Sequence, residues 1–378
     1  MLLPAALASG LALLFPGLAA ADADPIRAYG HEIREVTPGI HVMAQREPFH
    51  VQPLGNVTIF RQSDGFVVVD AGGTPAAGRQ VADALQRLGP APLKALVITH
   101  WHADHALGAA QLLARWPRAR LIATRHTHDQ MREGLAPFRE PSRLAGKLAT
   151  VADNYRTLAA DPGLSPAERR GHARTADEVA HYATQFDEAG IRLPTEFVED
   201  RLELDDPVRP LSVLHPGPAN TPGDLVVLSP RDRVVAVGDI VVAPLPFAFD
   251  VDPVSWAGVL AGLVEDRPRV VIPGHGAPMR DTAYASRLAG WLCDAHDRIT
   301  GASGDRAALE DQVETIAGGD PWLRRWARAY WAEPLAKSVR DQADASARSC
   351  PRVRGAIARE SAGRHDANEA PEATARNR

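Results

Sequence analysis

The sequence is poor in cysteine, in aromatic residues and in excess charge of either sign. Its 378 residues include two cysteines, Cys293 and Cys350, which excludes both a disulfide scaffold and a cysteine-based zinc site. The 42 Lys and Arg against 47 Asp and Glu give a net charge of −5, so no basic excess marks a nucleic-acid binder. The 45% hydrophobic and 24% charged content excludes collagen-like or wholly disordered chains and is typical of a globular protein.

The first twenty residues form an apolar run without lysine or arginine. Small residues follow the run up to Ala21, a pattern that predicts a signal peptide over 1–21 and a periplasmic or secreted protein. The missing basic residues leave open a misplaced start, a poor signal or a membrane tether. Pro4, Pro16 and Gly17 disfavour a spanning helix, so we expect no integral membrane span in the mature chain. Export would allow Cys293 and Cys350 to pair, which the sequence leaves open.

Strands and helices alternate in the first half of the chain, which predicts a layered α/β fold. Two short apolar runs around Ser63-Asp64-Gly65 predict a hairpin, and helical and strand patterns then follow in turn. The expected segments are strands Val57–Phe60 and Phe66–Asp70, helix Thr74–Leu88, strand Leu93–Thr99, helix Gly108–Trp116 and strand Leu121–Thr124.

Two expected helices, Leu144–Leu158 and Ala167–Gly190, predict a helical insertion over 144–190. Strands are expected again at Glu196–Leu204, Leu211–Leu214, Asp224–Leu228, Val234–Val237 and Val270–Ile272. A helical C-terminal extension over 301–350 follows, with Asp320-Pro321 as a helix start. Trp322, Trp326 and Tyr330 recur at helical spacing and are interpreted as core. Residues 352–378 are polar and aperiodic, which predicts a disordered tail.

The densest chemical signal is the run Thr99-His100-Trp101-His102-Ala103-Asp104-His105, directly after an apolar strand. Buried histidines and carboxylates without partners would cost desolvation free energy, whereas a bound divalent ion would satisfy them. Imidazoles suit zinc, and the carboxylate extends the set to a second ion. Asp239 and His275 also follow apolar strands, Val234–Val237 and Val270–Ile272, and complete the predicted set.

These motifs resemble those of the metallo-β-lactamase superfamily. The resemblance rests on the HxHxDH run, on Val67–Gly72, on Gly238–Ile240 and on Pro273–Gly276, in order between Ile40 and Pro278. It implies a four-layer αββα sandwich over about 30–300 with a metal site at one edge. By this resemblance His100 and His102 would hold a first zinc, Asp104, His105 and His275 a second, and Asp239 would bridge them. Asp70 would support the HxHxDH loop, although an ordinary turn residue explains it equally well.

Asn220 departs from the family pattern. The family places a third histidine ligand of the first zinc where this chain has Asn220, within Gly217–Asp224. An amide oxygen is a weaker zinc ligand than imidazole, so we expect a strong second site and a weakened first site. A mononuclear centre on Asp104, His105, Asp239 and His275 is one outcome. Substitution by His215 is another, although it lies five residues upstream and is expected to point elsewhere.

Two further segments lie close to these motifs in the sequence. His126 and His128 follow a predicted strand and would line the pocket mouth, although exposed histidines near a helix start are common. The loop Pro244–Phe249 follows Asp239 and is either an apolar substrate wall or a rigid connection. The other histidines, His31 among them, have no ligand-like setting.

The expected function is an exported metallohydrolase acting on a small ester, lactone, thioester or amide. Zinc, one or two ions per chain, would supply hydroxide at neutral pH for attack on the carbonyl, and Asp104 would orient that water. Iron or manganese also suits the carboxylates. Alternatives are a class B β-lactamase, a mononuclear iron dioxygenase-like enzyme and a non-catalytic metal-binding accessory protein. Chelator-sensitive turnover would separate an enzyme from a binding protein, and the oligomeric state stays open.

Overall fold

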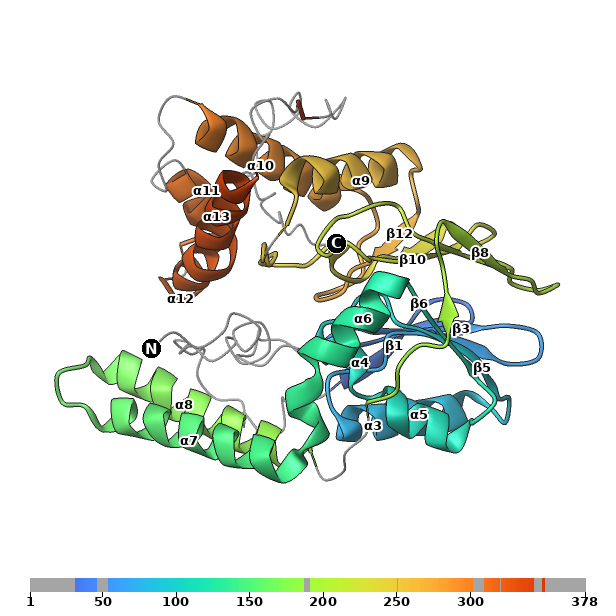
Figure 1. Ribbon diagram of the computed structural model, residues 1–378, viewed down its shortest axis with the longest axis horizontal. Helices are drawn as coiled ribbons and strands as arrows, with labels where there is room; N and C mark the ends of the chain where they lie inside the picture. The colour runs from blue at the N-terminus through green and yellow to red at the C-terminus, as the bar shows by residue number, and fades with distance from the viewer. Residues whose placement is uncertain are drawn as a thin grey trace, which may run out of the picture.

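The computed structural model describes residues 31–45, 54–186, 191–249, 251–301, 309–319, 321–342 and 349–350 (Figure 1). The predicted signal peptide and the predicted tail lie outside these residues, as do Asp320 and the side chain of Trp322. Among the described residues, no helix combines the length and apolar character needed to cross a membrane.

The first sheet has seven strands that pair in chain order, β1 to β7. Neighbouring strands from β1 to β4 are antiparallel, and those from β4 to β7 are parallel. The strands are β1 (His31–Thr37), β2 (Ile40–Gln45), β3 (Val57–Arg61), β4 (Phe66–Val69), β5 (Leu93–Val97), β6 (Arg120–Ala123) and β7 (Glu196–Phe197). The expected hairpin is the β3–β4 pair, whereas β1 and β2 were not predicted.

The second sheet has five strands in the order β12-β11-β10-β9-β8. Only β11 and β12 pair in parallel, and the other pairs are antiparallel. The strands are β8 (Arg201–Leu204), β9 (Leu211–Leu214), β10 (Val226–Ser229), β11 (Val234–Ala236) and β12 (Val270–Ile272). The prediction of one strand over Glu196–Leu204 was wrong: the chain leaves the first sheet after Phe197 and enters the second at Arg201.

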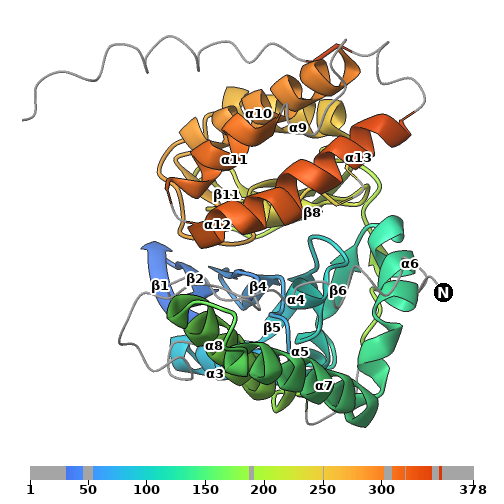
Figure 2. The ribbon, with the colours of Figure 1, turned by 90° about the vertical axis from the view of Figure 1, so that its left-hand side faces the viewer.

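Alternation along the strands packs the two sheets face to face. In β4, Val67 and Val69 point into the apolar layer between the sheets, and Phe66 and Val68 point to the helices outside. In β10, Val227 faces the layer between the sheets. This period of two is the signature of strands buried on both faces, and it confirms the four-layer αββα architecture, seen edge-on in Figure 2.

Helices cover the outer face of each sheet. The outer face of the first sheet packs against a cluster that includes residues of α3 (Pro75–Leu88), α5 (Ala109–Arg115), α6 (Arg125–Gly134), α7 (Pro141–Ala160) and α8 (Pro166–Ala183). The outer face of the second sheet packs against α9 (Pro253–Glu265), α10 (Ala283–Thr300), α11 (Glu310–Ala317), α12 (Pro321–Trp326), η5 (Ala327–Ala332) and α13 (Glu333–Asp341).

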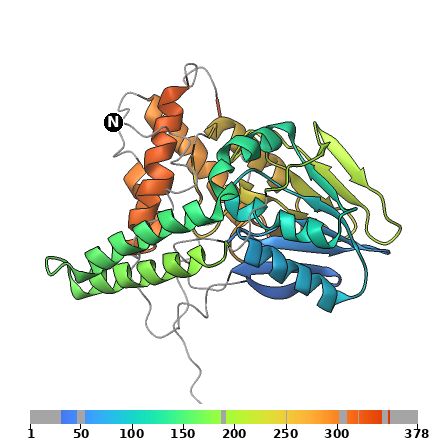
Figure 3. The ribbon, with the colours of Figure 1, turned by 60° about the horizontal axis from the view of Figure 1, so that its bottom comes forward.

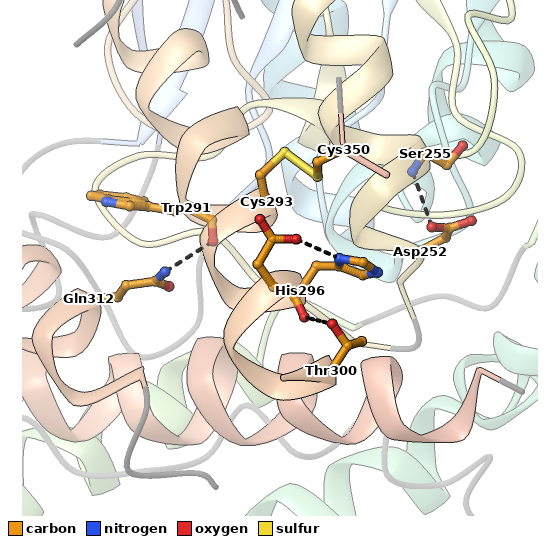
Figure 4. The surroundings of a disulfide bond; sticks show 9 residues. Asp252, Ser255, Trp291, Cys293, His296, Thr300, Gln312 and Cys350 are labelled. Carbon is orange, nitrogen blue, oxygen red and sulfur yellow. Dashed lines mark hydrogen bonds and ion pairs between the residues drawn. A yellow bond between two sulfur atoms is a disulfide. The ribbon is translucent and has the colours of Figure 1, made fainter. Parts of the chain in front are cut away.

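The expected insertion is a helical hairpin of α7 and α8, which projects from the body of the molecule (Figure 3). Ser165 and Glu168 form a reciprocal capping box at the start of α8, which explains why the chain turns there. In the C-terminal helices, the buried side chains of Trp326 and Tyr330 stack at 4.4 Å between ring centroids, as core residues do. Cys293 of α10 forms a disulfide bond with Cys350 (Figure 4).

Candidate metal centre

The candidate ligands gather at the edge of the sandwich where strands of both sheets end. His100 follows β5, and Asp104 and His105 lie in the short helix α4 (Ala103–Ala106). Asp239 lies in the single turn η3 (Gly238–Ile240) after β11, and His275 follows β12. Because β11 and β12 are parallel, both of their carboxyl ends reach the same edge. The arrangement expected from the strand ends is therefore present.

Two glycines let the backbone pack tightly around Asp239. A Cβ atom on Gly274 would lie 1.8 Å from Asp239 Oδ1 and 2.4 Å from the Gly238 carbonyl carbon. Gly238 itself has φ +53°, and a Cβ there would lie 2.5 Å from Thr99 Oγ1. Any side chain at Gly274 would push Asp239 away from the histidines, which gives a physical reason for the glycines in both motifs.

Three side chains form one group. His100 Nε2 lies 3.0 Å from His102 Nδ1 and 3.4 Å from Asp239 Oδ2, and His102 Nδ1 lies 4.0 Å from that same oxygen. Their ligand-type atoms all fall within 4.8 Å of one another, a spacing that suits a shared ion.

Asp104, His105 and His275 form a second group of the same compactness. His275 Nε2 lies 3.0 Å from Asp104 Oδ2 and 3.2 Å from His105 Nε2, and the last two side chains are 3.5 Å apart. Two imidazole nitrogens that face each other beside a carboxylate are the donor set of a zinc-type site.

Asp239 connects the two groups. Its Oδ2 faces His100 and His102, whereas its Oδ1 lies 3.2 Å from His105 Nε2 and 3.6 Å from His275 Nε2. Oδ1 is buried and accepts no hydrogen bond. A buried carboxylate oxygen without a hydrogen-bond donor is costly, and a cation would remove that cost. The residues present therefore fit a pair of metal ions with Asp239 between them.

The charges of the site also suit a cation. Burial lowers the pKa of His105, but the carboxylates of Asp239, Asp104 and Asp70 outweigh it and raise that pKa well above its usual value. Burial raises the pKa of Asp239, but His105, His275 and His100 more than reverse this and hold it well below its usual range. Burial lowers the pKa of His100 to about 4, so its imidazole is neutral at pH 7. The metal-free site therefore holds a proton among carboxylates where an ion would bind.

Asp70 supports the histidine run, as the family resemblance implied. Its Oδ2 accepts a hydrogen bond from His105 Nδ1 at 2.8 Å, and its Oδ1 accepts one from the backbone N–H of Thr99 at 2.8 Å. Asp70 is buried and adopts φ +63°, a left-handed conformation that few residues other than glycine, asparagine and aspartate accept. The reading of Asp70 as an ordinary turn residue does not explain these contacts.

Sequence reasoning missed Asn56, which holds the loop of His275. Its Nδ2 donates to the carbonyl oxygens of Pro273 and Gly276, each at 2.8 Å, and its backbone N–H donates to the Gly274 carbonyl at 2.7 Å. The side chain is buried beside β3, more than 200 residues away in the sequence. No local pattern marks this residue.

Asn220 is buried close to the group of His100 without a hydrogen bond to any candidate ligand. Its Nδ2 donates to the Phe247 carbonyl at 2.6 Å, and its Oδ1 accepts no hydrogen bond. The neighbouring candidate, His215, directs Nδ1 to the Asp224 carbonyl at 2.8 Å. In the loop Pro244–Phe249, the Phe247 ring lies edge-on to the imidazole of His275, with 6.2 Å between centroids.

Three other histidines lie outside both groups. His128 Nδ1 is 3.0 Å from the carboxylate of Asp129, its sequence neighbour, and burial lowers the pKa of His126. His31 lies beside the centre: its Nε2 donates to the Gly55 carbonyl at 2.9 Å, and burial lowers its pKa to about 4. These residues border the site and add no ligand to either group.

Comparisons with known proteins agree with the motifs. The family model described as "Metallo-beta-lactamase superfamily" matches residues 52–275, more than half of the chain. A linear primary-alkylsulfatase of Pseudomonas sp. is 23% identical over 280 residues, which are 70% of this chain and 51% of the relative. The "Probable metallo-hydrolase YflN" of Bacillus subtilis is 24% identical over 242 residues, 59% of this chain and 80% of the relative. The chain thus spans about half the length of the alkylsulfatase.

Solved structures were compared in the same way. A metallo-beta-lactamase from Pontibacter korlensis is 17% identical, with a TM-score of 0.48 over 69% of this chain and 98% of that one. The DIM-1 metallo-beta-lactamase is 15% identical, with a TM-score of 0.47 over 70% of this chain and 97% of that one. The family-model match and the motifs it contains establish that this chain belongs to the metallo-β-lactamase superfamily.

Proposed function

We propose that this superfamily hydrolase is a metal-dependent enzyme that cleaves a small ester, lactone, thioester or amide. The observation that carries the proposal is the pair of ligand groups, each within 4.8 Å, joined by the two oxygens of Asp239. Zinc is the ion that the imidazole-rich donor set favours, and the carboxylates also suit iron or manganese. Such ions lower the pKa of a bound water to about 7 and polarise a carbonyl group.

The exposure of the ligands indicates where substrate enters. The side chains of His102 and Asp104 are 20% and 16% exposed, whereas those of His100, His105 and Asp239 are at most 1% exposed. Asp104 is therefore the carboxylate that a water molecule and a substrate can reach. Burial raises its pKa, but His105 and His275 more than reverse this, so Asp104 is ionised at neutral pH. An ionised carboxylate beside the open face can orient a water and accept its proton.

The apolar boundary of the site is the second feature that bears on the substrate. Phe247 lies against His275, and Tyr330 of η5 packs edge-on against Phe247 with 5.7 Å between centroids. These contacts favour the reading of Pro244–Phe249 as an apolar wall, so we expect a substrate with an apolar acyl or alkyl part. The alkylsulfatase relative adds sulfate esters to the compounds worth testing.

Three alternatives stay with the proposal. A class B β-lactamase would need the same ions, but Asn220 departs from the usual histidine. A mononuclear iron dioxygenase-like enzyme would use one ligand group, and a non-catalytic accessory protein would bind metal without turnover. Export to the periplasm or outside the cell is proposed from the apolar N-terminal run together with the Cys293–Cys350 disulfide, which suits an oxidising compartment.

The test is turnover by the full chain after metal analysis. Purified protein is assayed with carboxylic ester, lactone, thioester, cephalosporin and alkyl sulfate substrates, before and after removal of metal with a chelator. We expect hydrolysis of at least one class, loss of activity on chelation and recovery with zinc. Asp104→Asn should lower kcat by about 10²-fold or more, on the order of what a general base contributes. A metal-loaded chain without turnover of any class would overturn the proposal and leave the accessory protein.

A further inference from the structure

Asn220 has a fixed orientation that its surroundings dictate. The Phe247 carbonyl can only accept a hydrogen bond, so the amide nitrogen of Asn220 must face it, at 2.6 Å. The amide oxygen consequently points away from Phe247. It accepts no hydrogen bond, although the residue is only 3% exposed. Leaving such an oxygen buried and unpaired costs about 1–3 kcal/mol, so a missing partner is indicated.

The loop of Asn220 is fastened to elements that carry ligands from both groups. The backbone N–H of Leu225 donates to the carbonyl of Thr99, the residue before His100, at 2.9 Å. On the other side, the residue that orients the amide, Phe247, packs edge-on against His275. Inside the loop, the buried Asp224 carboxylate accepts a hydrogen bond from the backbone N–H of Thr221 at 2.6 Å. Asn220 is therefore held in place beside the centre.

We propose that Asn220 Oδ1 is a ligand of the ion held by His100, His102 and Asp239, an inference that rests on the proposed metal-dependent function. An amide oxygen is a neutral and hard donor, in contrast to the imidazole that the family places there. The resulting centre has unequal halves. The half of His100 has one carboxylate, the shared Asp239, whereas the half of His105 has both Asp239 and Asp104.

This asymmetry orders the binding of the two ions. The half with two carboxylates takes the first ion and holds it more tightly, because more negative charge faces it. The half with Asn220 takes the second ion more weakly and exchanges it faster. Since hard oxygen donors suit manganese and magnesium better than nitrogen donors do, the weaker half discriminates less strongly in favour of zinc.

The experiment is a calorimetric titration of the metal-free full chain with zinc, repeated with cobalt, whose visible absorption reports the number of nitrogen ligands. We expect two steps for the unaltered chain. Asn220→His should tighten the weaker step by at least about tenfold, the lower end of the effect of changes one layer further out. It should also change the cobalt spectrum of that step alone. Asn220→Ala should loosen the weaker step by at least about tenfold and leave the tighter step in place.

Asn154→Ala, at an exposed asparagine of α7, is the matched control and should change neither step. If Asn220→Ala and Asn220→His both leave the two steps and the cobalt spectrum unchanged, Asn220 is not a ligand, although the metal-dependent function stands. If the unaltered chain binds one ion only and Asn220→His does not add a second, the half of His100 is not a metal site. If no ion binds to the unaltered chain, the proposed function itself fails. Because Asn220→His keeps a ligand-type side chain, it tests the proposal even where Asn220→Ala fails to fold.

Discussion

Asp70 Oδ2 and His105 Nδ1 form a buried hydrogen bond of 2.8 Å between the end of β4 and helix α4. The bond places the ring proton on Nδ1 and leaves Nε2 of His105 for the other candidate ligands, Asp104, Asp239 and His275. A carboxylate behind a histidine in this way fixes both the ring orientation and the tautomer of a metal ligand. Asp70 is therefore a positioning residue that does not itself face the candidate ions.

Asp70→Asn should weaken metal binding while the fold persists. Asparagine tolerates the left-handed conformation at this position, and its amide oxygen can still accept from the backbone N–H of Thr99. Its amide nitrogen would then face His105 Nδ1, which must become an acceptor and move the proton to Nε2. We expect zinc affinity to fall by about 10–100-fold, measured by competition with a chromogenic chelator.

Asp64→Asn is the matched control for this change. Asp64 is exposed and pairs with Lys94 at 2.6 Å in the hairpin before β4. Its loss removes the same charge from the chain and should leave zinc affinity unchanged. Equal affinities for Asp70→Asn and the unaltered chain would show that Asp70 has no influence on the ligands.

The ligand set could be predicted from the sequence because each candidate follows an apolar strand. His100, Asp239 and His275 all come directly after runs of valine, leucine and isoleucine, and strand ends meet at a sheet edge. The helical hairpin and the order of strands β9 to β12 could be predicted for a similar reason, since their periodicities are long or regular. The grouping of ligands in space agrees with what the family resemblance implied.

Contacts between distant segments could not be predicted. Asn56 holds the loop of His275 through backbone carbonyls, which any sequence at those positions would offer. The break after Phe197 depends on which sheet each half of one polar-apolar run pairs with, and alternation is the same in both sheets. The orientation of Asn220 likewise depends on the Phe247 carbonyl, 27 residues later.

Metal binding should release protons, because His105 holds one in the metal-free chain. The carboxylates of Asp239, Asp104 and Asp70 outweigh burial and raise the pKa of His105 well above its usual value. An ion can bind Nε2 only after that proton leaves. Below the raised pKa, zinc affinity should therefore fall by about tenfold for each unit of pH decrease and each proton released. Calorimetry in buffers of different ionisation enthalpy measures the number of protons, and a value of zero at pH 6 would contradict the charge assignment.

The Cys293–Cys350 disulfide should contribute to stability and not to metal binding. It closes a loop of 57 residues and ties the end of the described chain to α10, in the outer helical layer (Figure 4). Replacement of both cysteines by serine should lower the free energy of unfolding by about 2–4 kcal/mol, measured by urea denaturation. Reductant should lower the stability of the unaltered chain by the same amount and leave the double variant unchanged. A loss of zinc affinity in the double variant would show that the C-terminal helices help to shape the centre.

Asp206 fastens the two sheets at the edge opposite the candidate metal centre. Its carboxylate accepts hydrogen bonds from the backbone N–H of Ser63 at 3.0 Å and from the Ser63 hydroxyl at 2.5 Å, across the sandwich. It also accepts from the backbone N–H groups of Val208 and Arg209, at 2.9 Å and 2.7 Å. Burial raises the pKa of Asp206, but these donors outweigh it and lower the pKa to about 2.

The lowered pKa of Asp206 gives its stabilisation a defined pH range. An unfolded aspartate has a pKa of about 3.9, so between pH 4 and pH 2 the unfolded chain binds more protons than the folded one. The contribution is therefore complete above pH 4 and is lost as the pH falls toward 2. Asp206→Asn should cost about 2 kcal/mol at pH 5, because an amide accepts these hydrogen bonds less strongly and offers one oxygen only. In urea unfolding of the metal-free chains, this difference should shrink steadily from pH 4 to pH 2.5, while Asp153→Asn, at an exposed aspartate of α7, should show no such change. A difference that stays constant over this range would show that Asp206 acts through packing and not through its charge.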